Sequence, residues 1–142
     1  MLHLEFNSDS ENEGIARIVT AAYIMKFDPD MEEMDDIKTA VSEAVTNCIV
    51  HAYHGPDGKI SMELSDQNGI LRIEIKDQGI GISDVKKAME PMFTTKPEEE
   101  RTGMGFSFME AFMDQVEVIS KQGEGTTVIM TKKIGDQDKL NG

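Results

Sequence analysis

Hydrophobic and polar residues alternate at the start of the chain, where Leu2, Leu4 and Phe6 are each followed by a polar side chain. This period of two predicts a strand, because successive side chains of a strand point to opposite faces. The spacing then lengthens to that of helices. Two helices are predicted to follow, the first from the cap-type residues Ser8 to Ser10 through about Phe27 and the second from near residue 31 to residue 53.

The second half of the chain returns mainly to the strand pattern. Strands are predicted at residues 60–64, 70–76, 116–120 and 126–134, with a helix at about 106–114. The first two of these strands are separated by Asp66-Gln67-Asn68-Gly69, and Asn-Gly is a strong hairpin signal. The polar stretch from Asp77 to Gly105 is much longer than an ordinary connection, so we expect it to be functional.

These elements predict an α+β fold, a two-layer α/β sandwich in which helices cover one face of a mixed, mostly antiparallel sheet. The 142 residues fit one domain over 1–142, large enough to bury a core without disulfides or structural metals. The tail from about residue 135 to 142 is expected to fray.

Composition narrows the range of functions. A formal net charge of -13 disfavours direct nucleic-acid binding, which draws much of its affinity from neutralising phosphates. No stretch approaches the roughly 20 apolar residues of a membrane span. The first residues lack the basic start and apolar segment of a secretory signal, so a cytoplasmic protein is expected. Cys48 is the only cysteine and is typical of a small buried hydrophobe.

One candidate group lies on the second predicted helix. Glu43 and Asn47 are four residues apart and therefore project from one face, nearly opposite the apolar stripe that includes Val41 and Val45. His51 continues the same line. A carboxylate and an amide that converge are a candidate site, and a solvated helix face is the alternative.

A second candidate is Asp77, at the end of a predicted strand. The alternation through Ile73 and Ile75 places Asp77 on the inward side, where a carboxylate needs a hydrogen-bonding partner. An amino group on a ligand base would serve, and Gly79 and Gly81 would let the backbone come close. The alternative is an acidic strand end followed by a glycine turn.

A third candidate is the segment Thr102-Gly103-Met104-Gly105, which directly precedes the predicted helix at Phe106. Backbone N–H groups at a helix start can receive phosphate oxygens, although glycine there also serves as a simple cap. Lys96 and Arg101 place cations beside these glycines in an otherwise acidic chain. Surface solvation is the alternative for both cations.

The order of these pieces resembles the Bergerat-fold ATPases of the GHKL superfamily. Glu43 to Asn47 is similar to the N box, Asp77 to Gly81 to the G1 box and Gly103 to Gly105 to the G2 box. Gly125-Thr126-Thr127 resembles the closing Gly-Thr element. Within the superfamily, the whole chain is most similar to the anti-sigma F factors of spore-forming bacteria. The strings that carry this resemblance are Ser42 to Asn47, Phe93 to Pro97 and Arg101 to Phe106.

The resemblance implies a set of roles in binding ATP or ADP with Mg²⁺. Asn47 would ligate the metal, Asp77 and Thr127 would share the adenine amino group, and Glu43 would be the base toward a serine hydroxyl. Arg101 would balance charge on the transferring group and so act in catalysis. Nucleotide contacts are also implied for Gly79, Gly81, Lys96, Thr102, Gly103, Met104 and Gly105. Residues of about 82–105 would form an ATP lid.

The resemblance also implies two protein partners and a homodimer. The ATP form would sequester a sigma F-type sigma factor, and a serine of a STAS-type anti-anti-sigma factor would be phosphorylated. Arg17 and the run Glu98-Glu99-Glu100 are candidates for partner contacts, with a solvated face as the alternative. Three other functions stay open: an ATP-gated sigma-binding module without kinase activity, a histidine-kinase catalytic domain, and a chaperone-like or topoisomerase-like ATPase.

Overall fold

A computed structural model describes residues 1–53, 56–81 and 100–135, with only the backbone described for 100–105. Residues 82–99 of the predicted lid at 82–105, and residues 136–142 of the predicted frayed tail at 135–142, lie outside the described residues. The elements are β1 (Leu2–Asn7), α1 (Glu11–Ile24), a 3-10 turn η1 (Met25–Phe27), α2 (Met31–Asn47), a π-helix η2 (Cys48–Tyr53), β2 (Lys59–Gln67), β3 (Ile70–Asp77), α4 (Glu100–Phe112), β4 (Gln115–Lys121) and β5 (Gly125–Lys133).

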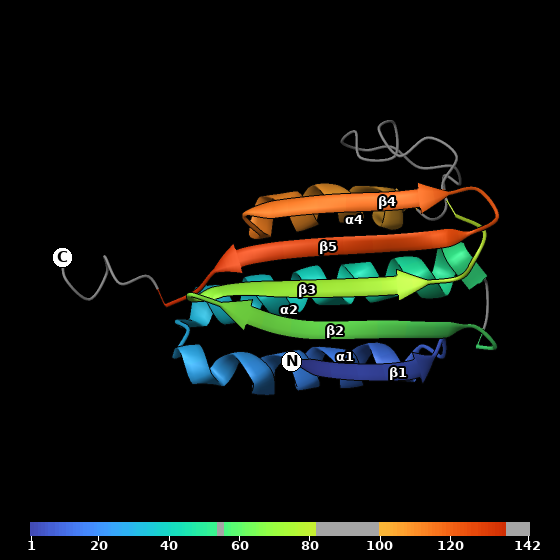
Figure 1. Cartoon of the computed structure of the whole chain (residues 1–142). Coiled ribbons are helices and arrows are strands. Elements are labelled where there is room, and N and C mark those ends of the chain that lie inside the picture. The colour runs from blue at the N-terminus through green and yellow to red at the C-terminus, as the bar shows by residue number, and fades with distance from the viewer. Residues whose placement is uncertain (54–55, 82–99, 136–142) are drawn as a thin grey trace.

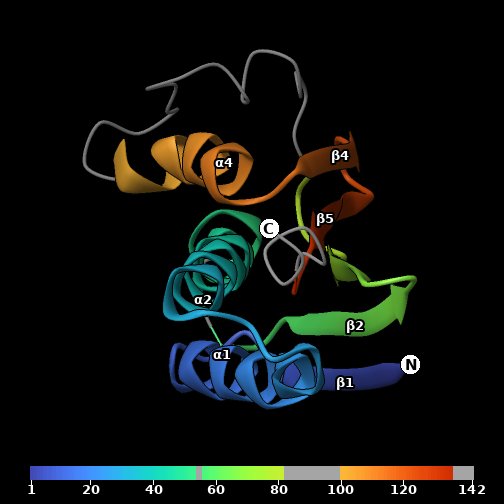
Figure 2. The ribbon, with the colours of Figure 1, turned by 90° about the vertical axis from the view of Figure 1, so that its left-hand side faces the viewer.

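The strands form one five-stranded sheet in the order β1-β2-β3-β5-β4, as Figure 1 shows. Each pair of neighbours is antiparallel. The helices cover one face of this sheet, which is seen edge-on in Figure 2. The predicted α+β sandwich is therefore confirmed. After β3 the chain leaves the sheet and forms α4. It then adds β4 as the edge strand, and β5 pairs between β4 and β3.

The β2–β3 connection confirms the predicted hairpin. β2 ends at Gln67 and β3 begins at Ile70, which leaves a two-residue loop. Asn68 and Gly69 have φ angles of 54° and 79°. Positive φ at both central residues is the signature of a type I′ turn, whose twist matches that of the flanking strands.

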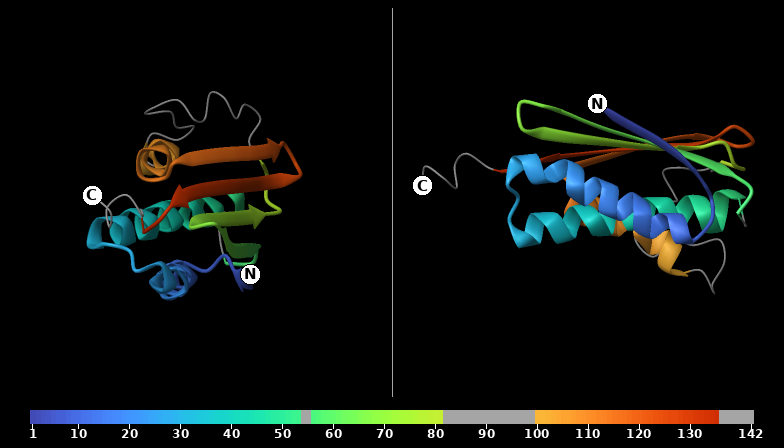
Figure 3. Two further views of the ribbon diagram at one scale, coloured as in Figure 1. Left: turned by 60° about the vertical axis from the view of Figure 1, so that its left-hand side comes forward. Right: turned by 90° about the horizontal axis from the view of Figure 1, so that it is seen from below.

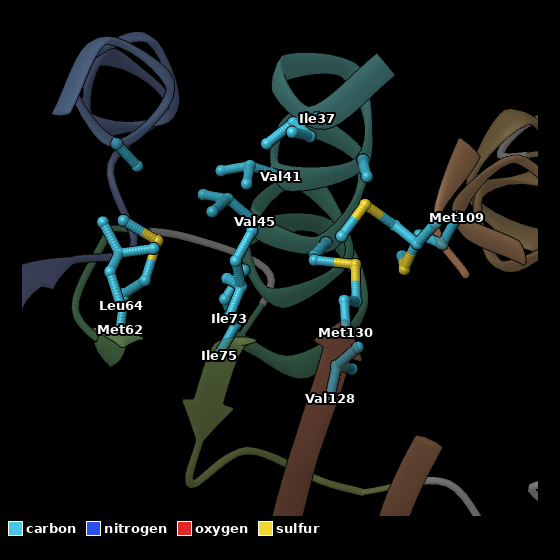
Figure 4. Packing of buried hydrophobic residues seen from close by; sticks show 14 of the residues in the cluster. Ile37, Val41, Val45, Met62, Leu64, Ile73, Ile75, Met109, Val128 and Met130 are labelled. Atoms are coloured by element: carbon cyan, nitrogen blue, oxygen red, sulfur yellow. The ribbon is translucent and has the colours of Figure 1, made fainter. Parts of the chain in front are cut away.

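The core lies between the sheet and α2. Alternate residues of β2, β3 and β5 point toward the helices and are buried, whereas the inward residues of the edge strands β1 and β4 are half-buried. Figure 4 shows Ile73 and Ile75 of β3 directed toward Val45 of α2, with Met130 of β5 beside them. Each such side chain stabilises the fold by about 1.5–3 kcal/mol on burial. α2 packs against α1 on one side and α4 on the other, which makes it the central helix of its layer.

A capping box fixes the start of α2. The Asp30 carboxylate accepts a hydrogen bond from the Glu33 backbone N–H at 2.7 Å, and the Glu33 carboxylate accepts from the Asp30 N–H at 3.0 Å. Two of the N–H groups that a helix start leaves without acceptors are satisfied in this way. The register of every later α2 side chain, including Glu43 and Asn47, follows from this start.

The predicted boundary of the last helix is wrong. We predicted a start near Phe106, but α4 begins at Glu100, so Gly103 and Gly105 lie inside its first turns. Two glycines within six residues lower helix propensity by about 1 kcal/mol each relative to alanine. The helix forms there nonetheless, because continuing the α-helical backbone gives its N–H and C=O groups partners.

No helix among the described residues is both long and apolar enough to cross a membrane.

Replacing Asp30 by alanine should lower the free energy of unfolding by about 1 kcal/mol, because the first turn of α2 then lacks a side-chain acceptor. Chemical denaturation of the variant and the wild type measures this difference. Asp35→Ala is the matched control, since Asp35 is an exposed acid of the same helix beyond its first turn. Equal stability losses in the two variants would contradict a specific role for the cap.

Candidate functional site

Three of the sequence candidates converge at one end of the molecule. The end of β3, the start of β5, the π-helix η2 and the N-terminal end of α4 all lie at the right-hand side of Figure 1, and Figure 3 shows the same grouping from other directions. This places the N-box, G1 and G2 segments at a common edge of the sandwich. The described surface hollow, about 370 Å³ and lined by residues such as Glu110, Glu117 and Ile129, involves none of these candidate residues.

The π-helix η2 extends α2 toward the end of β3. Its turns are wider than those of an α-helix, and such turns occur frequently at functional sites. The Ala52 carbonyl accepts a hydrogen bond from the Ile80 N–H at 3.3 Å. The Tyr53 hydroxyl accepts from the Gln78 N–H at 2.6 Å and donates to the Lys59 carbonyl at 2.6 Å. The end of the N-box helix is thereby tied to the G1 segment.

Asp77 is a buried carboxylate with three hydrogen-bond donors. Its Oδ1 accepts from the backbone N–H of Gly79 at 2.9 Å and of Thr126 at 3.1 Å. Its Oδ2 lies 3.4 Å from the sulfur of Cys48, whose thiol donates to it. The side chain is only 4% exposed. Burial raises the pKa of Asp77 above its ordinary value, and the three donors act in the opposite direction. The predicted inward orientation is confirmed.

Asn47 has a buried amide without a partner. Neither its side-chain oxygen nor its nitrogen has a hydrogen bond in the part of the chain that the structure describes, although both atoms are inaccessible to water. Leaving a buried polar group in this state costs about 1–3 kcal/mol. The alternative of a solvated helix face therefore does not fit Asn47. An amide oxygen without a hydrogen bond could ligate a metal ion such as Mg²⁺, which prefers oxygen ligands.

Ser107 shares this property and was missed by the sequence reasoning. Its hydroxyl oxygen is buried and has no hydrogen-bond partner among the described residues. It follows the G2 segment on α4, the helix that packs against α2. A buried hydroxyl in a helix is frequent, so the sequence held no signal that would have distinguished it.

The glycines of the G1 segment permit close contacts within the protein itself. A Cβ on Gly79 would lie 2.5 Å from both the Cβ and the carbonyl oxygen of Ala52, too close for any side chain. Gly81 has φ of 75° and lies against the Lys121 backbone. We interpreted these glycines as room for a base, and the described contacts account for them by backbone packing. Their contact with a nucleotide stays a prediction.

The prediction that Thr127 lies beside Asp77 is wrong, since Thr126 occupies that place. The Thr126 N–H binds Asp77, and its hydroxyl lies 2.7 Å from that of Ser120. Thr127 is opposite Lys76 and Ile119 in the sheet register, and the Ile119 side chain is exposed. Neighbouring strand residues face opposite sides, so only Thr126 shares the inward face with Asp77.

The phosphate candidates are placed only in part. Thr102, Gly103, Met104 and Gly105 lie in the first turns of α4 with Arg101, and their side chains are outside the described residues. Lys96 is outside them altogether. The first four N–H groups of a helix lack intrahelical acceptors, and Gly105 lies beyond these four. Its N–H group therefore belongs to the hydrogen-bonded ladder of the helix in this conformation.

Glu43 lies one turn before Asn47 on α2 and is half-buried. Its neighbour Ser42 donates a hydrogen bond to the Glu13 carboxylate of α1. Glu13 also forms an ion pair with the half-exposed Arg17 at 3.8 Å. Contacts between side chains thus connect the N-box helix to the candidate partner residue on α1.

Comparison with known proteins decides the family. Residues 6–132 match the model of the histidine kinase-like ATPase domain. The chain is 55% identical over 135 residues to the anti-sigma F factor of Caldanaerobacter subterraneus, with 95% of this chain and 94% of that protein covered. The chain belongs to the anti-sigma F factor family of histidine kinase-like ATPase domains. The predicted resemblance to the GHKL superfamily is confirmed by this match, and the roles of the N, G1 and G2 residues stay predictions.

Solved structures show that this anti-sigma F factor family member has the fold of larger proteins. It superposes on the histidine kinase domain of an Erythrobacter litoralis blue-light activated kinase with a TM-score of 0.58 and 23% identity, covering 77% of this chain and 48% of that one. For the RsbU and RsbW domains of Rv1364c from Mycobacterium tuberculosis, the TM-score is 0.63 at 17% identity, covering 94% and 32%. The chain thus spans half or less of these structures.

Replacing Asp77 by asparagine should remove a pH dependence of stability. Because burial raises the pKa of Asp77, the folded protein binds more protons than the unfolded chain between the ordinary and the raised value. Wild-type stability gained from this group is therefore lost as pH rises through that window. The amide keeps an oxygen for Gly79 and Thr126 but has no charge, so the variant should lack this slope.

Urea unfolding measured from about pH 4 upward tests the effect, because the ordinary aspartate pKa is about 3.9 and that of folded Asp77 lies above it. Asp57→Asn is the control, because Asp57 is exposed and the same charge is removed. If the slope of stability against pH is the same in Asp77→Asn as in the wild type and in Asp57→Asn, the raised pKa of Asp77 is contradicted.

Proposed function

We propose that this chain is an anti-sigma factor and a protein-serine kinase. It would bind a sigma F-type sigma factor in its ATP state, and would transfer the γ-phosphoryl group of Mg-ATP to a serine of a STAS-type anti-anti-sigma factor. The buried, unpartnered amide of Asn47 is the observation that supports this most directly, because it adjoins the Cys48–Asp77 contact and points to a missing ligand. Family membership supports the ATPase part.

Asp77 would recognise the base. A carboxylate oxygen can accept about two hydrogen bonds, and the two backbone donors on Oδ1 leave acceptor capacity on Oδ2. An amino group on adenine can donate to it. Thr126 acts on this recognition through its backbone, since its N–H helps to fix the carboxylate plane.

Asn47 would hold the metal through its side-chain oxygen. In the described residues no group of three or more His, Cys, Asp or Glu side chains gathers to hold a metal ion. One amide oxygen therefore fits an ion that takes its other ligands from phosphates and water, as Mg²⁺ does. Bound Mg²⁺ would offset the negative charge of the phosphates in this acidic protein.

Glu43 would accept the proton of the attacking serine hydroxyl, or orient that hydroxyl toward the γ-phosphorus. Phosphoryl transfer depends chiefly on positioning and charge stabilisation, so an ordinary carboxylate suffices. Arg101, with Lys96, would balance charge on the transferring group. Backbone N–H groups of Thr102 to Gly105 would hold the phosphates, that of Gly105 after its release from the hydrogen-bonded ladder of α4. The serine comes from another chain, so the partner completes the active site.

Glu43→Ala should abolish phosphoryl transfer and leave ATP affinity within about threefold, whereas Asn47→Ala should impair both, because only Asn47 holds the nucleotide through its metal. Calorimetry with Mg-ATP and a transfer assay with radiolabelled ATP measure the two effects. Glu32→Ala, an exposed acid in the first turn of α2, is the control. Transfer retained in Glu43→Ala would remove Glu43 from the catalytic role.

Gly105→Ala should weaken ATP binding by about fivefold. Alanine favours the helix by about 1 kcal/mol over glycine, and that helix start opposes release of the Gly105 N–H for a phosphate. Gly14→Ala on α1 is the matched control, because a Cβ there meets only Arg17 at 3.8 Å. Both variants should gain stability, and only Gly105→Ala should lose affinity. Unchanged affinity would show that α4 binds phosphate as it stands.

Mass spectrometry of a candidate anti-anti-sigma protein, incubated with this chain and Mg-ATP, tests the function as a whole. Phosphoserine on the partner supports the kinase. Binding of a sigma factor that requires ATP, with no label transferred, would favour the alternative of an ATP-gated sigma-binding module. Sedimentation with and without the sigma factor tests the proposed homodimer.

A further inference from the structure

Cys48 occupies a position that packing alone does not explain. It is the first residue of η2 and follows Asn47 directly. The side chain is 4% exposed, and its sulfur lies 3.4 Å from Oδ2 of Asp77. It therefore joins the segment of the metal candidate to the carboxylate of the base candidate.

Among the described residues, the thiol is the only donor to Oδ2, since both backbone donors bind Oδ1. A carboxylate has about four acceptor positions, two on each oxygen. Oδ1 is filled by Gly79 and Thr126, and Cys48 takes one position of Oδ2. One position is left, and its direction is fixed by the three donors already in place.

We propose that Cys48 is a positioning residue for base recognition, whose thiol orients Oδ2 of Asp77 so that its remaining acceptor position receives the amino group of an adenine nucleotide. The inference rests on the proposed nucleotide binding and adds a determinant of base specificity to it. It replaces the interpretation of Cys48 as a small buried hydrophobe only.

The surroundings of Asp77 make this donor important. From η2, the titratable side chains facing the carboxylate are Cys48 and Tyr53, and from β5 the contact is the Thr126 backbone. No charged side chain of the described residues contributes to the Asp77 pKa. In the contact with Cys48 the thiol is the donor, because an ionised carboxylate can only accept hydrogen bonds.

Removal of the thiol has a chemical consequence beyond packing. Without that donor, the buried carboxylate of Asp77 binds a proton at higher pH. The protonated Asp77 carboxyl donates a hydrogen bond from one oxygen. This donor repels the amino group of a base and can bind a carbonyl oxygen. Base preference should therefore shift from adenine, which carries an amino group, toward hypoxanthine, which carries a carbonyl at the same position.

The test compares ADP and inosine diphosphate binding across pH for the wild type, Cys48→Ala and Cys48→Ser. At neutral pH, Cys48→Ala should bind ADP about fivefold more weakly, the loss expected for one hydrogen bond. Its preference for ADP should shrink, and the pH midpoint of binding should rise. Serine keeps a donor, and a stronger one, so Cys48→Ser should retain the preference and have a lower midpoint than the wild type. Val41→Ala, a fully buried change on α2, controls for lost packing.

A Cys48→Ala variant with the wild-type preference for ADP and the wild-type pH midpoint of binding would overturn the positioning role. Cys48 would then be a packing residue. If that variant does not fold, a Cys48→Ser midpoint equal to that of the wild type overturns it instead. Loss of preference in Val41→Ala to the same extent would also overturn it. A wild type that binds no ADP would overturn the proposed function and this inference together. A wild type that binds ADP, with an unchanged preference in Cys48→Ala, would overturn the inference alone.

Discussion

The buried carboxylate of Asp77 is the contact on which the arrangement of the site depends. A carboxylate removed from water is costly unless donors surround it, and here they come from three places in the chain: the G1 segment, the start of β5 and the end of the N-box helix. These places are far apart in sequence. The hydrogen bonds of this one carboxylate therefore fix the relative positions of the ends of two strands and a helix.

Close backbone contacts reinforce this arrangement. Gly79 lies against Ala52, and Gly125, with φ of 91°, lies against the Asp77 backbone. No side chain fits at either point. The π-helix then brings the Ala52 carbonyl to the Ile80 N–H, so that the wide turn is held by hydrogen bonds at its far end. On the base side the polar groups of the site are hydrogen-bonded, whereas the side-chain atoms of Asn47 and Ser107, which have no partner among the described residues, lie on the helices.

The spacing of hydrophobic residues predicted much of this structure, because one face of each strand and helix packs against the core and must be apolar. The alternation through Ile73 and Ile75 placed Asp77 inward, and Asn68-Gly69 specified the hairpin turn. Errors arose where a single residue decides the outcome. Thr126 and Thr127 have the same chemistry, so only their parity with Val128 and Met130 separates them. The start of α4 and the π-turn depend on tertiary packing and backbone hydrogen bonds, for which local propensity is a weak guide. The contact between Cys48 and Asp77 joins residues 29 positions apart, and no local pattern reports it.

The order of strands has a consequence for how such a domain can diversify. β3 and β5 pair directly, although α4 and β4 lie between them in the chain. The chain that connects β3 to α4 therefore leaves and rejoins the sandwich without setting the register of any strand pair. Beyond Gly81, its length and composition can change while the strand pairing and the hydrogen bonds of Asp77 to Gly79 and Thr126 stay intact. Variation among descendants of this scaffold can therefore concentrate in one segment of the chain, and the pairing of the strands tolerates it.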